Sequence, residues 1–282
     1  MNMVSQLVEV SPAYDVILCD VWGVLHNGQS AWASASAALA AAREGGKTIV
    51  LITNSPRPAP GVRAQLGLLG VPEEAWDAIA TSGDVTRTLM ANAPRRQFHL
   101  GPDRDLSLFD GLDIDLVDEF EADAIVCTGL YDDETETPED YEEMLARFRG
   151  RDLPFICANP DIVVERGDRL VYCAGALARR YALMGGRTLI AGKPHEPIYD
   201  LALKLAAEAR GAQTPKEKVL VIGDGITTDV KGAMDNGFDL VFITDGIHAR
   251  EYGEHGRPDQ AQLAKFLSDF GAEPVALMTK LA

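Results

Sequence analysis

The sequence predicts an α/β protein built on a doubly wound parallel sheet, with a second α/β unit inserted into it. Short, continuous apolar runs alternate with helical patterns at both ends of the chain, as in a parallel sheet covered on both faces. Glycine follows several helical stretches, where a left-handed cap is common, at Gly45-Gly46, Gly185-Gly186, Gly211 and Gly237. The 282 residues suffice for a core and a smaller inserted unit.

Each half of the predicted core repeats the order of strands and helices. In the N-terminal half, strand-like runs at 15–21 and 47–53 enclose a helix at 31–44, and a second helix ends near Gly70. In the C-terminal half, the strand-like runs TLIAG, KVLVIGD and DLVFITDG alternate with helices at 197–210 and 228–236. We therefore expect a core of residues 1–83 and 188–282.

The intervening residues carry strand and helix patterns of their own. Strand-like runs are FHLG, ADAIVCTG and PFICANPD, and helical patterns span residues 138–149 and 175–184. These patterns predict that residues 84–187 form an inserted α/β cap.

The composition excludes several classes of protein. Lys and Arg number 26 against 43 Asp and Glu, and the formal charge of −17 repels a nucleic-acid backbone. No apolar run approaches the roughly 18 residues of a membrane span. The N-terminal segment carries Glu9 and Asp15 but no basic residue, so it does not resemble a secretory signal. Four widely spaced cysteines without a C-x-x-C pair predict free thiols and a cytoplasmic protein.

Polar residues follow four of the predicted strands. They are, in chain order, Asp20, Thr53 with Asn54, Lys193, and Asp224 with Asp229. In an open parallel sheet, ligands bind beyond the carboxyl ends of the strands. Each of these residues alone is typical of a turn, a helix cap or a surface loop. Their combination in this order indicates a functional site.

These residue types suit phosphoryl transfer. A carboxylate can attack phosphorus only if the charge of the phosphate is neutralised, and Mg²⁺ with a lysine neutralises it. We predict that Asp20 is both the nucleophile and a Mg²⁺ ligand. The carbonyl of Trp22 and the carboxylates of Asp224 and Asp229 are predicted to complete the protein ligands.

The remaining strand-end residues are predicted to hold the phosphate. The hydroxyl of Thr53 and the N–H of Asn54 are placed to bind phosphate oxygens. Lys193 is expected to pair with both Asp20 and the phosphate. Its ammonium group acts as a compact charge, since the site does not need the planar, bidentate guanidinium of an arginine.

At these residues the chain resembles the haloacid-dehalogenase superfamily, class IIA, whose members include nitrophenyl-phosphatase-like and pyridoxal-phosphate-phosphatase-like enzymes. The resemblance implies a Rossmann-like core and a large cap, between Thr53 and Lys193, that selects the substrate. It also implies that the segments Asn159-Pro160-Asp161 and 173–176 face the catalytic lobe, which makes Asn159 and Asp161 candidate substrate-binding residues. A simple turn explains Asn-Pro-Asp equally well. Relatives often pair through their caps, so a homodimer is expected.

One position departs from the family pattern. The phosphatases of this superfamily typically carry a second Asp two positions after the nucleophile, as acid and base, and here that position is Trp22. Indole cannot exchange this proton, and loss of an acid/base group typically costs on the order of 10² to 10⁴ in rate. His26 is the nearest titratable residue, but an exposed loop histidine before the Asn27-Gly28 turn is the better interpretation.

Trp22 leaves two alternatives open. Dehalogenases of the superfamily have an aromatic residue at this position and release halide, which needs no proton, yet they require no divalent metal. In the second alternative, the chain is a protein that binds a phosphorylated metabolite with little turnover. The sequence does not identify the small phosphorylated substrate, which cap residues select.

Overall fold

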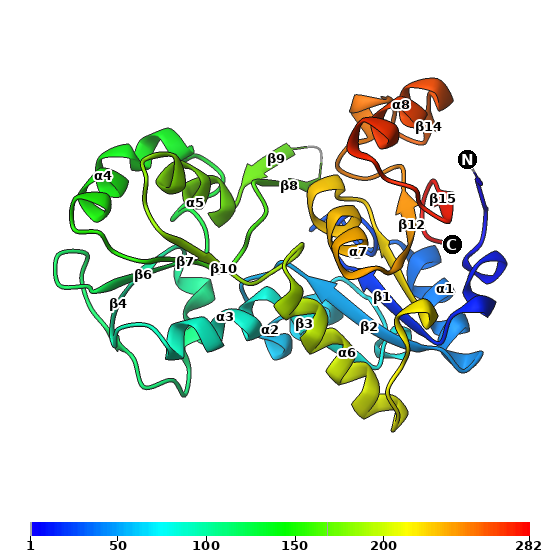
Figure 1. The fold of residues 1–282 in the computed structure, drawn as a ribbon, viewed down its shortest axis with the longest axis horizontal. Helices are drawn as coiled ribbons and strands as arrows, with labels where there is room; N and C mark the ends of the chain where they lie inside the picture. Colours follow the sequence, from blue (N-terminus) through cyan, green and yellow to red (C-terminus); the bar gives the residue numbers. More distant parts are fainter. Residues whose placement is uncertain (1, 168) are drawn as a thin grey trace. The chain divides into compact units, whose positions relative to one another are not determined.

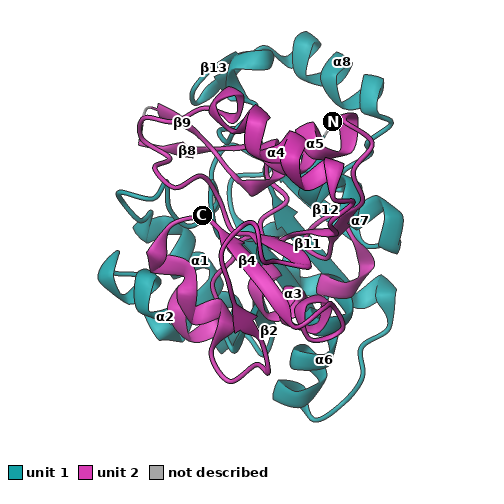
Figure 2. Ribbon diagram, turned by 90° about the vertical axis from the view of Figure 1, so that its left-hand side faces the viewer, with its two compact units in different colours: residues 1–53, 63–80, 199–282 teal, residues 54–62, 81–198 magenta. Residues whose placement is uncertain are grey.

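The computed structural model describes residues 2–167 and 169–282, and it divides into two compact units (Figures 1 and 2). The first unit comprises the chain up to Thr53 with residues 63–80 and 199–282. The second comprises residues 54–62 and 81–198. The chain thus enters the second unit twice before it completes the first. The domain limits 1–83, 84–187 and 188–282 stay a prediction.

The first unit is built on a six-stranded sheet in the order β15-β12-β11-β1-β2-β3. The pairs β1–β2, β1–β11, β11–β12 and β12–β15 are parallel. The strands consist of apolar, mostly fully buried residues, as expected for a sheet covered on both faces. Their bounds are β1 (Val16–Asp20), β2 (Thr48–Thr53), β3 (Ala78–Thr81), β11 (Val219–Gly223), β12 (Asp239–Ile243) and β15 (Ala276–Met278).

The strand order places a topological switch point between β1 and β11. From β1 the chain continues to β2 and β3 on one side, and it later returns to β11 on the other side. The crevice at the carboxyl ends of two such strands is where open α/β sheets bind ligands. The predicted parallel sheet is therefore confirmed, and its switch point lies between the two strands that carry the predicted carboxylates.

Helices and turns accompany this sheet. The left-handed conformations of Gly46 (φ +88°), beyond the first helix, and Gly237 (φ +72°), at the end of α7, agree with the predicted caps. The helices wholly or largely in this unit are α1 (Ala33–Glu44), α2 (Ala59–Leu68), α6 (Glu196–Arg210), α7 (Lys231–Asn236) and α8 (Gln260–Phe270). Shorter elements are η1 (Leu7–Glu9), η2 (Ser11–Ala13), η3 (Glu73–Ala75), η6 (Lys216–Lys218), the π-helix η7 (Ile226–Val230), η8 (Ala249–Glu251), β13 (Gly253–Glu254) and β14 (Arg257–Pro258).

The second unit has its own five-stranded parallel sheet in the order β10-β7-β6-β4-β5. These strands are β4 (Arg96–Leu100), β5 (Asp115–Leu116), β6 (Ala124–Cys127), β7 (Phe155–Cys157) and β10 (Thr188–Ile190). An antiparallel hairpin adds β8 (Val163–Arg166) and β9 (Arg169–Tyr172). The helical elements are α3 (Ser82–Ala91), η4 (Asp103–Phe109), η5 (Pro138–Tyr141), α4 (Glu142–Gly150) and α5 (Ala174–Leu183).

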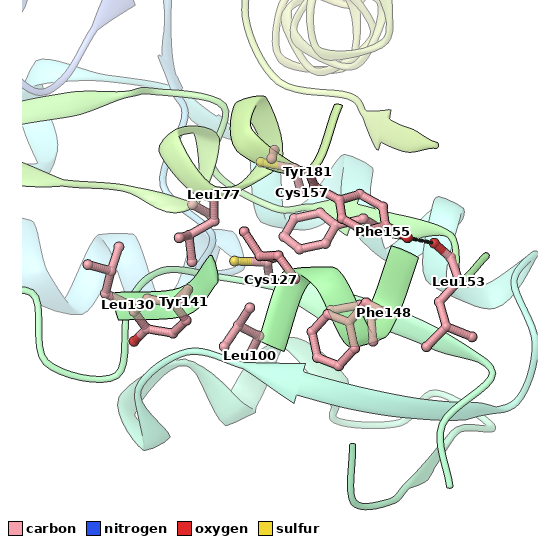
Figure 3. Close-up of a cluster of buried hydrophobic side chains, with 14 residues drawn as sticks. Leu100, Cys127, Leu130, Tyr141, Phe148, Leu153, Phe155, Cys157, Leu177 and Tyr181 are labelled. Carbon is pink, nitrogen blue, oxygen red and sulfur yellow. Dashed lines mark hydrogen bonds between the residues drawn. The ribbon is translucent and has the colours of Figure 1, made fainter. Parts of the chain in front are cut away.

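A separate hydrophobic core supports the second unit (Figure 3). The Phe155 ring stacks on Tyr181 with centroids 5.2 Å apart, and the Tyr181 hydroxyl donates to the Leu153 carbonyl at 2.6 Å. The buried thiols of Cys127 and Cys157 belong to the same core, and all four cysteines are free, as predicted. Burial raises the pKa of the Cys157 thiol to about 12, so this thiol is a packing group rather than a nucleophile.

One strand lies in a different sheet from the one we predicted. The run TLIAG was expected in the core, but it forms β10 and pairs with β7 in the second unit. Its three residues are each half-buried, as suits an edge strand. A short apolar run shows no periodicity that tells which of two parallel sheets it joins. The helices α3 and α8 and the edge strand β15 were not predicted from the sequence.

Candidate active site

Three buried carboxylates meet at the switch point of the first unit. Asp20 ends β1, Asp224 directly follows β11, and Asp229 lies in η7. Their side chains each offer an oxygen such that all three oxygens lie within 4.8 Å of one another. The residues are only 5%, 4% and 1% exposed. The structure thus brings together the three carboxylates that the sequence predicted at one site.

A π-helical turn directs Asp229 toward this site. The N–H of Val230 donates to the carbonyl of Gly225 at 3.0 Å, five residues back. The side chain of Asp229 accepts the N–H of Gly225 at 3.1 Å through Oδ2. A π turn widens the backbone by one residue and is frequent at functional sites. Here it places a carboxylate of the first helical turn beside the end of β11.

Backbone donors fix the other two carboxylates. Oδ1 of Asp20 accepts the N–H of Val21 at 2.7 Å, and Oδ2 of Asp224 accepts the N–H of Ile247 at 2.8 Å. Such charge-assisted bonds stabilise the ionised forms. The donor of Asp224 comes from the segment after β12, which the sequence analysis did not connect with the site. A backbone N–H leaves no signature in the residue types, so no pattern could have revealed it.

Three glycines leave the space that the carboxylates occupy. A Cβ atom at Gly23 would lie 2.3 Å from Oδ2 of Asp224, and one at Gly246 would lie 2.1 Å from the same atom. A Cβ atom at Gly223 would lie 2.2 Å from Cγ of Asp229. Any side chain at these positions would displace a carboxylate. The site is therefore defined by close backbone approach as much as by its acidic residues.

The donor set fits a hard divalent cation. Three like charges held within 4.8 Å in a buried site repel one another strongly at low dielectric. All the side-chain atoms that could bind the cation are carboxylate oxygens, the ligands that Mg²⁺ and Ca²⁺ prefer over nitrogen or sulfur. Within the described residues, this is the one group of three acidic, histidine or cysteine side chains with metal-binding geometry. The metal role of the Trp22 carbonyl stays a prediction.

His26 is buried, which corrects the expectation of an exposed loop histidine. Its ring lies edge-on to the Trp22 indole with centroids 5.0 Å apart, and its Nδ1 accepts the N–H of Gly28 at 3.0 Å. Burial lowers the pKa of His26 to about 4. The ring is therefore neutral at physiological pH. The short 21–32 segment folds back on itself, since Trp22 and His26 form a β-bridge, and this encloses the imidazole.

Thr53 lies on the strand next to that of Asp20 in the same sheet. It ends β2, and its neighbour Ile52 pairs in register with Asp20 of β1. Its side chain is 5% exposed. Parallel pairing therefore places a hydroxyl residue one position beyond the predicted nucleophile, on the adjacent strand. Its role in phosphate binding stays a prediction.

The other predicted residues form a network within the second unit. The amide of Asn54 accepts the N–H of Lys193 at 2.7 Å and donates to the Lys193 carbonyl at 3.3 Å. The same amide donates to Oδ1 of Asp161 at 2.8 Å. Asn54 therefore fixes the backbone at the buried Lys193, which follows β10. Asn159 accepts the N–H of Asp161 at 3.1 Å, a turn interaction. Substrate binding by Asn54, Asn159 and Asp161 stays a prediction.

The fold and the acidic site together define an α/β protein whose sheet switch point carries a buried cluster of three aspartates. A haloacid dehalogenase-like hydrolase family model matches residues 17–115, and an HAD-hydrolase-like model matches residues 190–270. A hydrolase of the haloacid dehalogenase-like family from Brucella suis is 56% identical, with 99% of this chain and 100% of that chain covered and a TM-score of 0.90. The chain belongs to the haloacid dehalogenase-like hydrolase family, which confirms the resemblance.

More distant structures share the fold. A possible sugar phosphatase of the HAD superfamily from Cytophaga hutchinsonii is 20% identical over 99% of this chain and 98% of its own, with a TM-score of 0.79. A 4-nitrophenylphosphatase from Thermotoga maritima is 24% identical over 95% of each chain, with a TM-score of 0.69. The comparison with curated proteins gave no match. None of the helices in the described part of the chain has the length and apolar character to cross a bilayer.

Proposed function

We propose that this hydrolase is a Mg²⁺-dependent phosphatase that cleaves a small phosphomonoester through an aspartyl-phosphate at Asp20. The observation that carries the proposal is the convergence of Asp20, Asp224 and Asp229 within 4.8 Å at the switch point. Two of the distant structures bear phosphatase names, and this supports the same reaction. A bound Mg²⁺ would supply the positive charge that allows an anionic nucleophile to approach an anionic phosphate.

The chemistry proceeds in two displacements. In the first, a carboxylate oxygen of Asp20 forms a bond to phosphorus while the bond from phosphorus to the substrate oxygen breaks. The leaving oxygen takes a proton from solvent water and departs as an alcohol. In the second, water attacks the same phosphorus and gives up a proton to solvent, the bond from phosphorus to the Asp20 oxygen breaks, inorganic phosphate leaves, and the carboxylate of Asp20 is regenerated. The Val21 N–H, which holds Oδ1 of Asp20 at 2.7 Å, keeps the carboxylate oriented for both steps.

Thr53 and Lys193 are proposed to bind the transferred phosphoryl group. Register places Thr53 one position beyond the Asp20 pair on the neighbouring strand. Lys193 is only 2% exposed, and its backbone N–H and carbonyl are both held by the Asn54 amide. Because Asn54 directly follows Thr53, the proposed hydroxyl donor is adjacent in sequence to the residue that fixes the backbone of Lys193. Asn159 and Asp161 are proposed to face the rest of the substrate.

Trp22 limits which substrates the enzyme turns over quickly. It replaces the usual acid/base carboxylate, and the nearby His26 is neutral because burial lowers its pKa to about 4. An imidazole with so low a pKa is a weak source of a proton at neutral pH. We therefore expect good leaving groups to be released faster than alkoxides. The same residue favours a second candidate function, release of halide from a small haloacid, since halide needs no proton.

Activity measured with and without chelation separates the candidates. The purified protein is assayed on 4-nitrophenyl phosphate and on a 2-haloacid, each with Mg²⁺ and with EDTA. The phosphatase proposal expects phosphate release that EDTA abolishes and added Mg²⁺ restores. Halide release that is indifferent to EDTA would instead establish the dehalogenase. Binding of phosphate without release of product from either compound would identify a binding protein.

Substitution of the nucleophile completes the test. Asp20→Asn is expected to lower phosphate release by at least about 10³-fold, because an amide cannot form the covalent intermediate. The matched control is Asp133→Asn in the second unit, whose carboxylate pairs with Arg104 and Arg166. This control is expected to retain activity. A screen of sugar, nucleotide and cofactor phosphates then identifies the substrate. We also propose that the protein is cytoplasmic and forms a homodimer. Measurement of its mass in solution tests the homodimer.

A further inference from the structure

A closed segment after β12 lies beside the carboxylate site of the first unit. It runs from Thr244 to Tyr252, and the buried Tyr252 hydroxyl donates to the Thr244 carbonyl at 2.9 Å. Inside it, the N–H of Ala249 donates to the carbonyl of Gly246 at 3.0 Å. The Tyr252 ring packs against Phe266 of α8 with centroids 5.2 Å apart. The segment is therefore tied at both ends and held against a helix.

This segment contacts the carboxylate of Asp224 and the turn that carries Asp229. The N–H of Ile247 donates to Oδ2 of Asp224 at 2.8 Å. The next residue, His248, accepts the N–H of Ile226 at 3.1 Å through Nε2. Ile226 is the first residue of η7, the turn that carries Asp229. Two consecutive residues thus hold the loop after β11 at the carboxylate of Asp224 and at the start of the turn that carries Asp229.

His248 supplies a hydrogen-bond acceptor to the first turn of η7. The first N–H groups of a helix have no acceptor within the helix, and a side chain commonly supplies one. Here the residue at the cap position is Gly225, which has no side chain to offer. The imidazole of His248 supplies an acceptor from a segment that is distant in sequence. Without it, the turn that aims Asp229 at the site would lose a fixed point.

The hydrogen bonds of His248 require one tautomer. An amide N–H can only donate, so Nε2 must carry the lone pair. On the other side of the ring, Nδ1 lies 2.5 Å from Oε1 of Glu251, and an ionised carboxylate can only accept. The ring proton therefore lies on Nδ1. Glu251 selects the acceptor form of Nε2, and the Phe266 ring, with its centroid 5.3 Å away, limits rotation of the imidazole.

We infer that His248 and Glu251 are a positioning pair for the metal-binding carboxylates, in which Glu251 holds His248 in the tautomer that anchors η7. The inference rests on the proposed function, because it assigns the pair to the same cation site. The hydrogen bonds of His248 go to Ile226 and Glu251 and not to the predicted ligands. It acts through Ile226 and, with its neighbour Ile247, sets the distance between Asp224 and Asp229. Partners behind metal ligands typically change metal affinity 10- to 100-fold when they are removed.

The test measures Mn²⁺ binding to the full chain by electron paramagnetic resonance, without substrate. His248→Ala is expected to weaken Mn²⁺ affinity by about 10- to 100-fold. His248→Gln places an amide oxygen near the position of Nε2 and is expected to restore most of the affinity. His248→Asn, whose amide lies nearer the position of Nδ1, is expected not to restore it. The matched control is His255→Ala, because His255 pairs with Asp245 at 2.9 Å and contacts a different part of the loop.

A spectroscopic measurement on the unmodified protein accompanies the variants. The ¹⁵N shifts and couplings of His248 report which ring nitrogen carries the proton, and the Nδ1–H tautomer is expected. Glu251→Ala is expected to shift this signature toward the other tautomer and to weaken Mn²⁺ binding. Thermal unfolding of each variant shows whether a loss of affinity comes with loss of the fold.

The outcomes separate this inference from the proposed function. A native protein that binds no Mn²⁺ overturns the metal site itself and the inference with it. If the native protein binds Mn²⁺ and His248→Ala binds it equally well, the inference alone is overturned. An Nε2–H tautomer in the native protein overturns it as well, even if His248→Ala fails to fold. Restoration by Gln but not by Asn supports it.

Discussion

The two units use the same kind of parallel sheet but differ in the surroundings of their most closely grouped acidic residues. In the first unit, three carboxylates are buried and their oxygens approach one another within 4.8 Å. In the second, acidic side chains meet arginines: Asp133 contacts both Arg104 and Arg166, and Glu134 contacts Arg166 and Arg169. Arginine lowers the pKa of Asp133 through a hydrogen bond from Arg166. Exposed pairs of this kind contribute little to stability, but they leave little uncompensated charge for a ligand.

The difference shows which structural feature brings carboxylates together at the edge of a parallel sheet. A parallel sheet delivers side chains to its carboxyl edge in either unit. In the first unit, the glycines at 23, 223 and 246 let the backbone come so close that the carboxylates converge. Like charges that converge in a buried site favour a cation, whereas charges paired with arginine do not need one. The comparison predicts that function depends on space around the carboxylates as well as on the carboxylates themselves.

Among the effects that this comparison predicts, the largest is expected from filling that space. In Gly246→Ala, the new Cβ would lie 2.1 Å from Oδ2 of Asp224, so the carboxylate or the backbone must move. A displacement of about 1 Å at a reacting site can cost on the order of 10² in rate. We expect kcat on 4-nitrophenyl phosphate to fall by about that factor, with weaker Mg²⁺ activation. Both are measured in a Mg²⁺ titration of the initial rate.

The second unit offers the matched control. Gly129 is also buried and follows β6, but a Cβ atom there would meet only Cδ of Pro102, at 3.7 Å, an ordinary contact. Gly129→Ala is therefore expected to retain the activity and Mg²⁺ dependence of the native protein. Equal losses in the two variants would contradict the view that the glycines of the first unit exist to accommodate the carboxylates.

A smaller effect, of opposite sign, is expected at Trp22. Trp22→Asp restores a carboxylate two residues after Asp20, where it can give a proton to the leaving oxygen. We expect kcat to rise by about 10-fold or more on an alkyl phosphate and to rise less on 4-nitrophenyl phosphate, whose leaving group needs little help. The indole packs on His26 and covers Gly28, so its loss is also expected to lower the melting temperature.

Trp22→Phe is the control for this prediction. It keeps an aromatic ring beside His26 but adds no titratable group, so the preference between the two substrates is expected to stay unchanged. If Trp22→Asp improved neither substrate, another group would already supply the proton. The same assays therefore show whether the indole limits the turnover of alkyl phosphates.

The carboxylate site could be predicted from the sequence because its geometry follows from strand order. Asp20 and Asp224 each stand at the end of an apolar run, and parallel pairing of adjacent strands brings such ends together. Asp229 follows at the start of the next helix. The pattern of residue types therefore predicts the position of the site. It also predicts that Thr53 ends the neighbouring strand, on the other side of β1.

The supports of the site could not be predicted because they are not encoded as residue types. The donor to Asp224 is a backbone N–H of Ile247, which any residue but proline could supply. His248 reaches Ile226 across the fold, from a loop whose path the sequence does not specify. His26 was expected to be exposed because it precedes an Asn-Gly turn, but the 21–32 segment folds over it. The residue types of the run at 188–192 likewise do not indicate which of the two sheets it joins.

The two units are also expected to respond differently to acid, and this is the smallest effect. Burial lowers the pKa of His26 in the first unit to about 4, from an ordinary value of 6.5. Burial also lowers the pKa of His99 in the second unit, but Asp105 and Asp103 oppose that shift. A histidine that is neutral when folded adds stability that is present above pH 6.5. As the pH falls from 6.5 toward 4, the unfolded chain binds a proton that the folded chain excludes, and this stability is lost.

The free energy of unfolding in urea, measured in EDTA between pH 7 and pH 4.5, tests this difference. The slope from one such histidine approaches about 1.4 kcal/mol per pH unit at most. His26→Asn, whose amide oxygen can still accept the Gly28 N–H, is expected to remove more of the slope than His99→Gln. If the units unfold in separate transitions, the change belongs to the transition of the first unit. Equal slopes in both variants would show that the carboxylates of the second unit do not offset the burial of His99.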